Sequence, residues 1–137
     1  MRRPARRNAA AGVVRLIGAN GSGVITHVVL LRPRADLPAT ERAGLADALR
    51  VAIETIPSIR RARIGRRVRF GRGYEELMHT DYEFVALLDF DDLDGLKAYL
   101  DHPAHEALAA RFFQVLDDAL MYDYDVEEGV KGLDRLV

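Results

Sequence analysis

The hydrophobic positions of this chain alternate between strand-like and helix-like spacing. Residues 24–32 form a β-branched, apolar run that is typical of a buried strand. Period-two alternation places Ile25, His27, Val29 and Leu31 on one face of this strand and Val24, Thr26, Val28 and Leu30 on the other. Because both faces are largely apolar, the strand is expected to need cover on both sides.

A helix is predicted after this strand. Pro33 ends the strand, and Asp36, Pro38 and Thr40 supply helix start signals. Apolar residues then recur at spacings of three and four until Pro57 closes the helix. The resulting single stripe consists of Leu45, Leu49, Ala52, Ile53 and Ile56.

The second half of the chain predicts three more strands and two helices. Strands are expected at about residues 59–70, 82–90 and 120–126, and a polar tail at residues 128–137. Asp92 is a good cap for a short helix that carries Leu96 and Tyr99. Pro103 stands at the permissive first position of the next helix, whose apolar side includes Leu108 and Phe112.

The order of these elements, β-α-β-β-α-α-β, predicts the fold class. It indicates an α+β, ferredoxin-like domain over residues 24–127, with an antiparallel sheet and helices on one face. The helices can cover only one face, yet the first and third strands are apolar on both. A second copy of the same sheet is the economical cover, through an isologous two-fold contact. We therefore predict a homodimer joined through the sheet face, a dimeric α/β barrel.

Composition and charge narrow the classes of function. The 137 residues suit one domain, and the lack of cysteine excludes disulfides, thiolate metal sites and a cysteine nucleophile. A cytoplasmic protein is the simplest interpretation, and no apolar run approaches the roughly 20 residues that span a membrane. Residues 1–22 hold five arginines and no acid, so 15 of the 20 basic residues remain against 21 acidic ones. We predict a flexible basic arm at residues 1–23 on an acidic body that would repel nucleic acid.

A glycine-rich segment and an arginine-rich segment are each expected to have a structural role. The glycine-rich residues 18–23 are not a phosphate loop, because Val24 and Ile25 stand where lysine and serine or threonine are required. The arginine run at residues 60–72 is expected to be a solvated face or edge protection, with an anion site as the alternative. Aromatic residues for base stacking are scarce in that run, which argues against single-stranded nucleic acid.

Several short motifs carry a resemblance to a known family. They are Ile-Thr-His-Val-Val-Leu-Leu around His27, Ile56-Pro57-Ser58, Gly65, Tyr99-Leu100-Asp101-His102-Pro103-Ala104-His105 and Tyr122-Asp123-Tyr124. Together they resemble the stress-responsive dimeric α/β-barrel (Dabb) family over about residues 24–126, and the His-Pro-Ala-His element is the most specific. The resemblance implies a homodimer whose two sheets form a barrel. It implies activity less closely, because the family includes stress-related proteins and a plant polyketide cyclase.

His105 is the most interesting candidate side chain. It shares its helix face with Leu108 and Phe112, so it is expected to point toward the sheet. In cyclase-like members, the positions matching Tyr99 and His105 form a proton-handling pair, and the position matching His27 lines the pocket. The resemblance therefore implies His105 as a cofactor-independent general base and Tyr99 as its partner. The candidate ligand-binding residues are His27, Val29, Leu31, Leu45, Leu49 and Ala86.

The sequence leaves two functions open. The cyclase pocket is walled by bulky aromatics on the first helix, whereas Leu45, Ala46 and Leu49 stand there in this chain, so a different ligand is expected. One possibility is a Dabb-type dimer of unassigned activity that binds a small organic ligand, and the alternative is a cofactor-independent cyclase or lyase. A structural role for the His105–Tyr99 pair is the alternative, since buried tyrosines and helix-start histidines often only satisfy hydrogen bonds. No metal is expected, because no acid completes a ligand set with His102 and His105.

Overall fold

The computed structural model describes residues 23–137. Its main elements are β1 (Val24–Pro33), α2 (Ala39–Thr55), β2 (Arg61–Arg66), β3 (Phe84–Phe90), α3 (Leu93–Asp101), α4 (Pro103–Val115) and β4 (Leu116–Val126). Two 3₁₀ helices complete it, η1 (Gly73–Leu77) and η2 (Gly129–Leu136). The predicted basic arm lies, apart from Gly23, outside the described residues. No helix within residues 23–137 is both long and apolar enough to cross a lipid bilayer.

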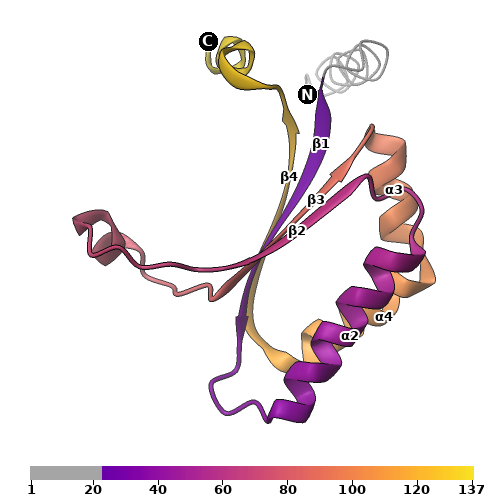
Figure 1. The fold of residues 1–137 in the computed structure, drawn as a ribbon, viewed down its shortest axis with the longest axis vertical. Coiled ribbons are helices and arrows are strands. Elements are labelled where there is room, and N and C mark those ends of the chain that lie inside the picture. Colours follow the sequence, from indigo (N-terminus) through magenta and orange to yellow (C-terminus); the bar gives the residue numbers. More distant parts are fainter. Residues whose placement is uncertain (1–22) are drawn as a thin grey trace, which may run out of the picture.

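The four strands form one antiparallel sheet with the order β2-β3-β1-β4. The first strand is central, and its residues pair with β3 on one side and β4 on the other. All three α-helices lie on the same face of the sheet (Figure 1). The ferredoxin-like α+β prediction is confirmed.

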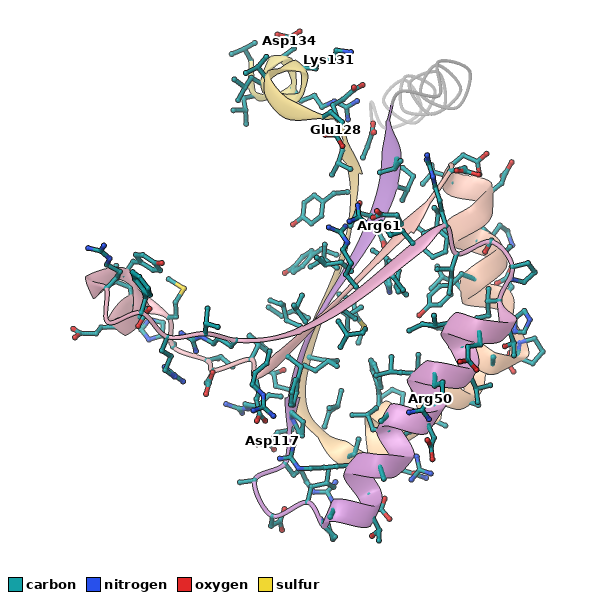
Figure 2. All side chains as sticks on the ribbon, viewed as in Figure 1. Arg50, Arg61, Asp117, Glu128, Lys131 and Asp134 are labelled. Atoms are coloured by element: carbon teal, nitrogen blue, oxygen red, sulfur yellow. The ribbon has the colours of Figure 1, made fainter. Side chains whose placement is uncertain are left out.

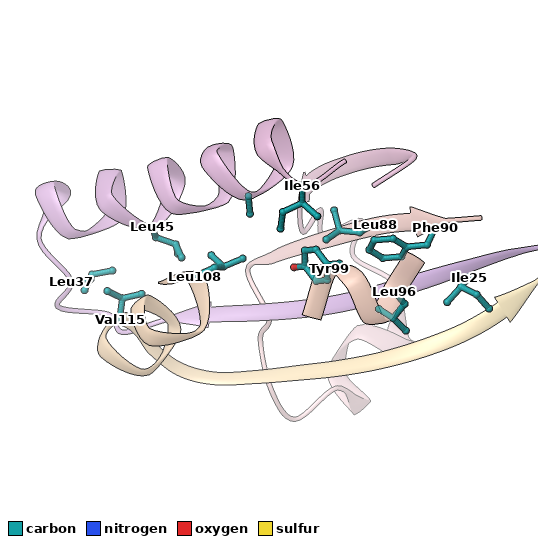
Figure 3. Packing of buried hydrophobic residues seen from close by; sticks show 11 residues of the cluster. Ile25, Leu37, Leu45, Ile56, Leu88, Phe90, Leu96, Tyr99, Leu108 and Val115 are labelled. Atoms are coloured by element: carbon teal, nitrogen blue, oxygen red, sulfur yellow. The ribbon is translucent and has the colours of Figure 1, made fainter. Parts of the chain in front are cut away.

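The hydrophobic core lies between the helices and this face of the sheet (Figure 3). The predicted division of β1 is correct, because Ile25, His27, Val29 and Leu31 are all buried there. The stripe of α2 contributes Leu45 and Ala52 to the main core cluster, together with the following Ile56 and with Ile25 of β1. On the opposite, outer face, most of the alternate β1 residues stay half-buried.

The corner between α3 and α4 is held by two side-chain caps. The carboxylate of Asp92 accepts a hydrogen bond from the Gly95 backbone N–H at 2.9 Å and starts α3. Nδ1 of His102 accepts one from the Ala104 N–H at 3.0 Å and starts α4, with Pro103 at its first position. Both caps satisfy N–H groups that a helix start leaves unpaired. They fix the relative position of Tyr99 near the end of α3 and His105 in the first turn of α4.

Two predicted strand boundaries were wrong. The β2 strand ends at Arg66 rather than near residue 70, because its last pairing partner, Phe84, is the first residue of β3. Its C-terminal continuation leaves the sheet as a projecting arm, residues 67–83 (Figure 1). The β4 strand begins at Leu116 rather than near residue 120, because Asp118 and Ala119 already pair with the end of β1.

The arginine run and the polar tail are organised by ion pairs. Asp81 binds both Arg67 (2.6 Å) and Arg69 (2.7 Å) and so ties the two sides of the projecting arm together. Arg135 of η2 contacts Asp125 (2.7 Å) and Glu127 (3.1 Å), so the expected tail is an ordered 3₁₀ helix. Two further arginines of the run pair with other acids, Arg60 with Asp91 at 3.2 Å and Arg63 with Asp89 at 3.4 Å.

Candidate functional site

A cavity of about 400 Å³ opens between the helices and the sheet. Its walls come from β1, β3, β4 and all three α-helices. Most of its lining is aliphatic or aromatic, and its polar side chains are His27, Tyr99, His105, Asp117 and Asp118. The first three lie at one part of the wall and the two aspartates at the start of β4.

Tyr99 stands between two histidines in this wall. Its ring centroid is 4.8 Å from that of His105 and 5.6 Å from that of His27, and both contacts are edge-on. The ring also packs on Phe90 at 5.3 Å, which joins the polar cluster to the core. The structure thus brings together the three residues for which the sequence predicted chemistry. It places one on β1, one on α3 and one on α4.

His27 has an acidic partner across the sheet. Its Nδ1 lies 2.5 Å from an Oδ1 of Asp123, the residue opposite it on β4. Opposite residues of an antiparallel pair share a face, so the carboxylate lies beside the imidazole on the helix-covered side. The bond fixes the ring orientation of His27 and occupies one of its two nitrogens. Asp123 was not predicted as a site residue, although the alternation of Tyr122, Asp123 and Tyr124 indicates that it faces the other way from the two tyrosines.

Burial sets the protonation states of Tyr99 and His105. It raises the pKa of Tyr99 to about 12, with a further contribution from the negative charge of Asp123. The phenol therefore stays protonated and is a hydrogen-bond donor. Burial also lowers the pKa of His105, and repulsion from His27 lowers it further, against the opposing effects of the Leu100 backbone and Glu106. At neutral pH, His105 is thus an uncharged base.

The other predicted binding residues divide into two groups. His27, Val29, Leu49 and Ala86 line the cavity. Leu45 lies in the main core, and Leu31 lies in a second buried cluster on the sheet; both are outside the cavity wall.

The aromatic part of the cavity wall comes from α4, through Phe112 and Phe113. The apolar spacing of α4 predicts Phe112 only as part of a core stripe, and it makes no prediction for Phe113. The signal that could have found them is the aromatic pair itself, on the helix that carries His105. Among the residues that the structure describes, no three His, Asp or Glu side chains come close enough together to hold a metal ion.

The family model for the stress responsive A/B barrel domain, Dabb, matches residues 25–126. The chain belongs to the Dabb family. The match spans β1 to β4 and therefore includes every polar residue of the cavity wall. No curated protein sequence matches this Dabb protein.

Solved structures resemble this Dabb protein over about three quarters of its length. A dimeric ferredoxin-like protein of unknown function from Thermobifida fusca is 25% identical, with a TM-score of 0.61 over 77% of this chain and 92% of that one. A Dabb family protein with a ferredoxin-like fold from Mesorhizobium loti is 24% identical, with a TM-score of 0.62 over 78% and 99%. A hydroxynitrile lyase from Passiflora edulis is 13% identical, with a TM-score of 0.65 over 77% and 95%. The last two show the shared fold alone.

Proposed function

We propose that this Dabb protein binds a small organic molecule in the cavity beside Tyr99 and His105. The observation that carries the proposal is the cavity itself. Protein interiors are close-packed and contain few voids larger than a water molecule. A hollow of about 400 Å³, mostly apolar and with a few polar groups on one wall, has the size and chemistry of a ligand site.

Two neighbouring alanines of α4 allow a matched test of this proposal. Ala109 lines the cavity, whereas Ala110 is exposed beside it. We expect Ala109→Phe to fill the cavity and weaken binding about tenfold or more, while Ala110→Phe binds as the wild type does. The measurement is a screen of small neutral aromatic compounds by thermal shift, since a ligand at a hundred times its Kd adds about 2.7 kcal/mol of stability.

Two results of the screen would contradict ligand binding in this cavity. One is that no compound raises the melting temperature of the wild type. The other is that Ala109→Phe and Ala110→Phe respond equally to a compound that does bind, which would place its site elsewhere.

We also propose that the protein is a homodimer joined through the outer face of its sheet. By strand register, Val28, Leu30, Val85, Leu87, Leu120 and Tyr122 lie together on that face. A groove there continues beneath the projecting arm, where Leu77 and Met78 add exposed apolar side chains. Monomeric proteins rarely expose a contiguous apolar patch of this kind. The related Thermobifida fusca protein is described as dimeric.

A lysine on the outer face is expected to break the proposed dimer. Val28→Lys would bury an unpaired charge in each half of an isologous contact, whereas Val51→Lys adds the same charge on the exposed side of α2. Sedimentation velocity should give twice the 15.3 kDa chain mass for the wild type and Val51→Lys, and a monomer for Val28→Lys. A monomeric wild type, or a dimeric Val28→Lys variant, would refute the proposed interface.

The protonation states favour catalysis as a second candidate function. We propose a cofactor-independent lyase or cyclase in which neutral His105 takes a proton from a carbon next to a carbonyl group. The protonated phenol of Tyr99 donates a hydrogen bond to the oxygen on which negative charge develops. His27, oriented by Asp123, completes the polar wall.

A further inference from the structure

We propose that the ligand of this cavity is an uncharged molecule of about two fused rings with one hydrogen-bonding group, and that carboxylates and phosphates are excluded. This inference rests on the proposed ligand-binding function. It adds the chemical class of the ligand to that function. Three features of the cavity support it: its volume, the charges on its wall and the hydrogen-bonding groups beside Tyr99.

The volume of the cavity indicates the size of the ligand. An apolar cavity of about 150 Å³ in a protein core holds one benzene molecule. The cavity in this chain, at about 400 Å³, is more than twice as large. Its long apolar wall includes Val29, Leu88, Leu108 and Phe112, so the body of the ligand is expected to be hydrophobic. A bicyclic aromatic skeleton matches both properties.

The charges around the cavity disfavour anions. Among the described residues that line it there is no lysine or arginine, and there are two aspartates. Asp117 lies at the start of β4 (Figure 2), where an exposed ion pair with Arg32 at 3.5 Å partly offsets its charge. Asp118 accepts hydrogen bonds from the Tyr82 hydroxyl at 2.7 Å and the Ala119 N–H at 3.0 Å. Asp118 lies opposite Arg32 in the β1–β4 ladder, on the outer face with Leu120, so Asp117 is the acid whose charge faces the cavity.

The polar groups at the other part of the wall suit a neutral ligand. The Tyr99 phenol is a donor, and His105, which is neutral at pH 7, offers a ring nitrogen as acceptor or donor. The imidazole of His27 already faces the carboxylate of Asp123. A hydroxyl, carbonyl or carboxamide group can be satisfied by such partners. An ionised carboxylate would lose its hydration without gaining a free cation in exchange.

Three probes of one chemical series test the inference. The dissociation constants of 2-naphthamide, 2-naphthoate and benzamide would be measured by calorimetry on the full chain at neutral pH. We expect 2-naphthamide to bind about tenfold or more tightly than 2-naphthoate, which has the same skeleton and a negative charge. Benzamide is expected to bind about tenfold or more weakly than 2-naphthamide, because it lacks the second ring.

Matched variants test whether the preference for 2-naphthamide over 2-naphthoate arises in the cavity. Asp117→Asn keeps the shape of the side chain and removes its charge, so the preference for the amide over 2-naphthoate should shrink several-fold. Asp134→Asn removes one charge from the exposed η2 segment and should leave the preference unchanged. Ala109→Phe should weaken the binding of 2-naphthamide, and this result would place the probe in the cavity.

The outcomes separate this inference from the function on which it rests. If 2-naphthoate binds as tightly as 2-naphthamide, or if benzamide does, the proposed ligand class is wrong while the cavity remains a binding site. If the amide preference is the same in Asp117→Asn as in the wild type, the electrostatic argument is wrong. If neither naphthalene probe binds to the wild type, both this inference and the proposed function are contradicted.

Discussion

Replacing His105 by glutamine is expected to reduce catalysed proton exchange at carbon by roughly 10²–10⁴-fold, the usual contribution of a general base. Glutamine keeps the polarity and approximate size of the side chain but cannot accept the proton. The loss should therefore occur with the fold intact. Two-ring neutral ketones with an acidic C–H bond, such as 2-tetralone, match the proposed cavity and provide the probe.

Exchange of the C1 protons of 2-tetralone in deuterated water can be followed by NMR. His79→Gln is the matched control, because His79 is exposed on the projecting arm. Since burial lowers the pKa of His105, the catalysed rate should rise with pH through a midpoint below pH 6.5, the ordinary value for histidine. A rate rise centred at or above pH 6.5, or equal rates in the two variants, would rule out His105 as the base. Ligand binding would stand independently of that result.

The element order and the buried face of β1 could be predicted from the sequence because they follow from local periodicity. Alternation in residues 24–32 identifies which side chains share a face, and this held for Ile25, His27, Val29 and Leu31. The cap Asp92 was likewise recognisable, because a helix start needs a nearby acceptor. Each of these features depends on residues close together in the chain.

The wall of the cavity was harder to predict because it depends on how far each element extends. The helical spacing predicts that Leu45 and Leu49 both face the core, but it does not predict which of them lines the cavity. In the structure, only Leu49 of these two does. The contact between His27 and Asp123 joins residues 96 positions apart and needs the register of β1 with β4. The early part of β4 was not predicted because Asp117 and Asp118 interrupt the apolar pattern by which a strand is recognised.

Phe90→Ala is expected to lower the free energy of unfolding by about 3–5 kcal/mol, the usual range for removal of a buried phenylalanine. Phe90 is the last residue of β3 and has no exposed surface. It packs closely against the start of α3, because a Cβ added to Gly95 would lie only 3.4 Å from the Cβ of Phe90. Its ring also supports Tyr99 at 5.3 Å. The substitution would therefore leave a void next to the candidate site, so probe binding should weaken together with stability.

The same chemical change at Phe113 provides the control, because that side chain is 90% exposed at the cavity edge. Phe113→Ala should change the free energy of unfolding by no more than about 0.5 kcal/mol. Urea unfolding of both variants and the wild type at one protein concentration gives the comparison, since the stability of a dimer depends on concentration. Equal losses in the two variants would mean that the β3–α3 corner is not a rigid support. Tyr99 would then have no fixed position from which to assist His105.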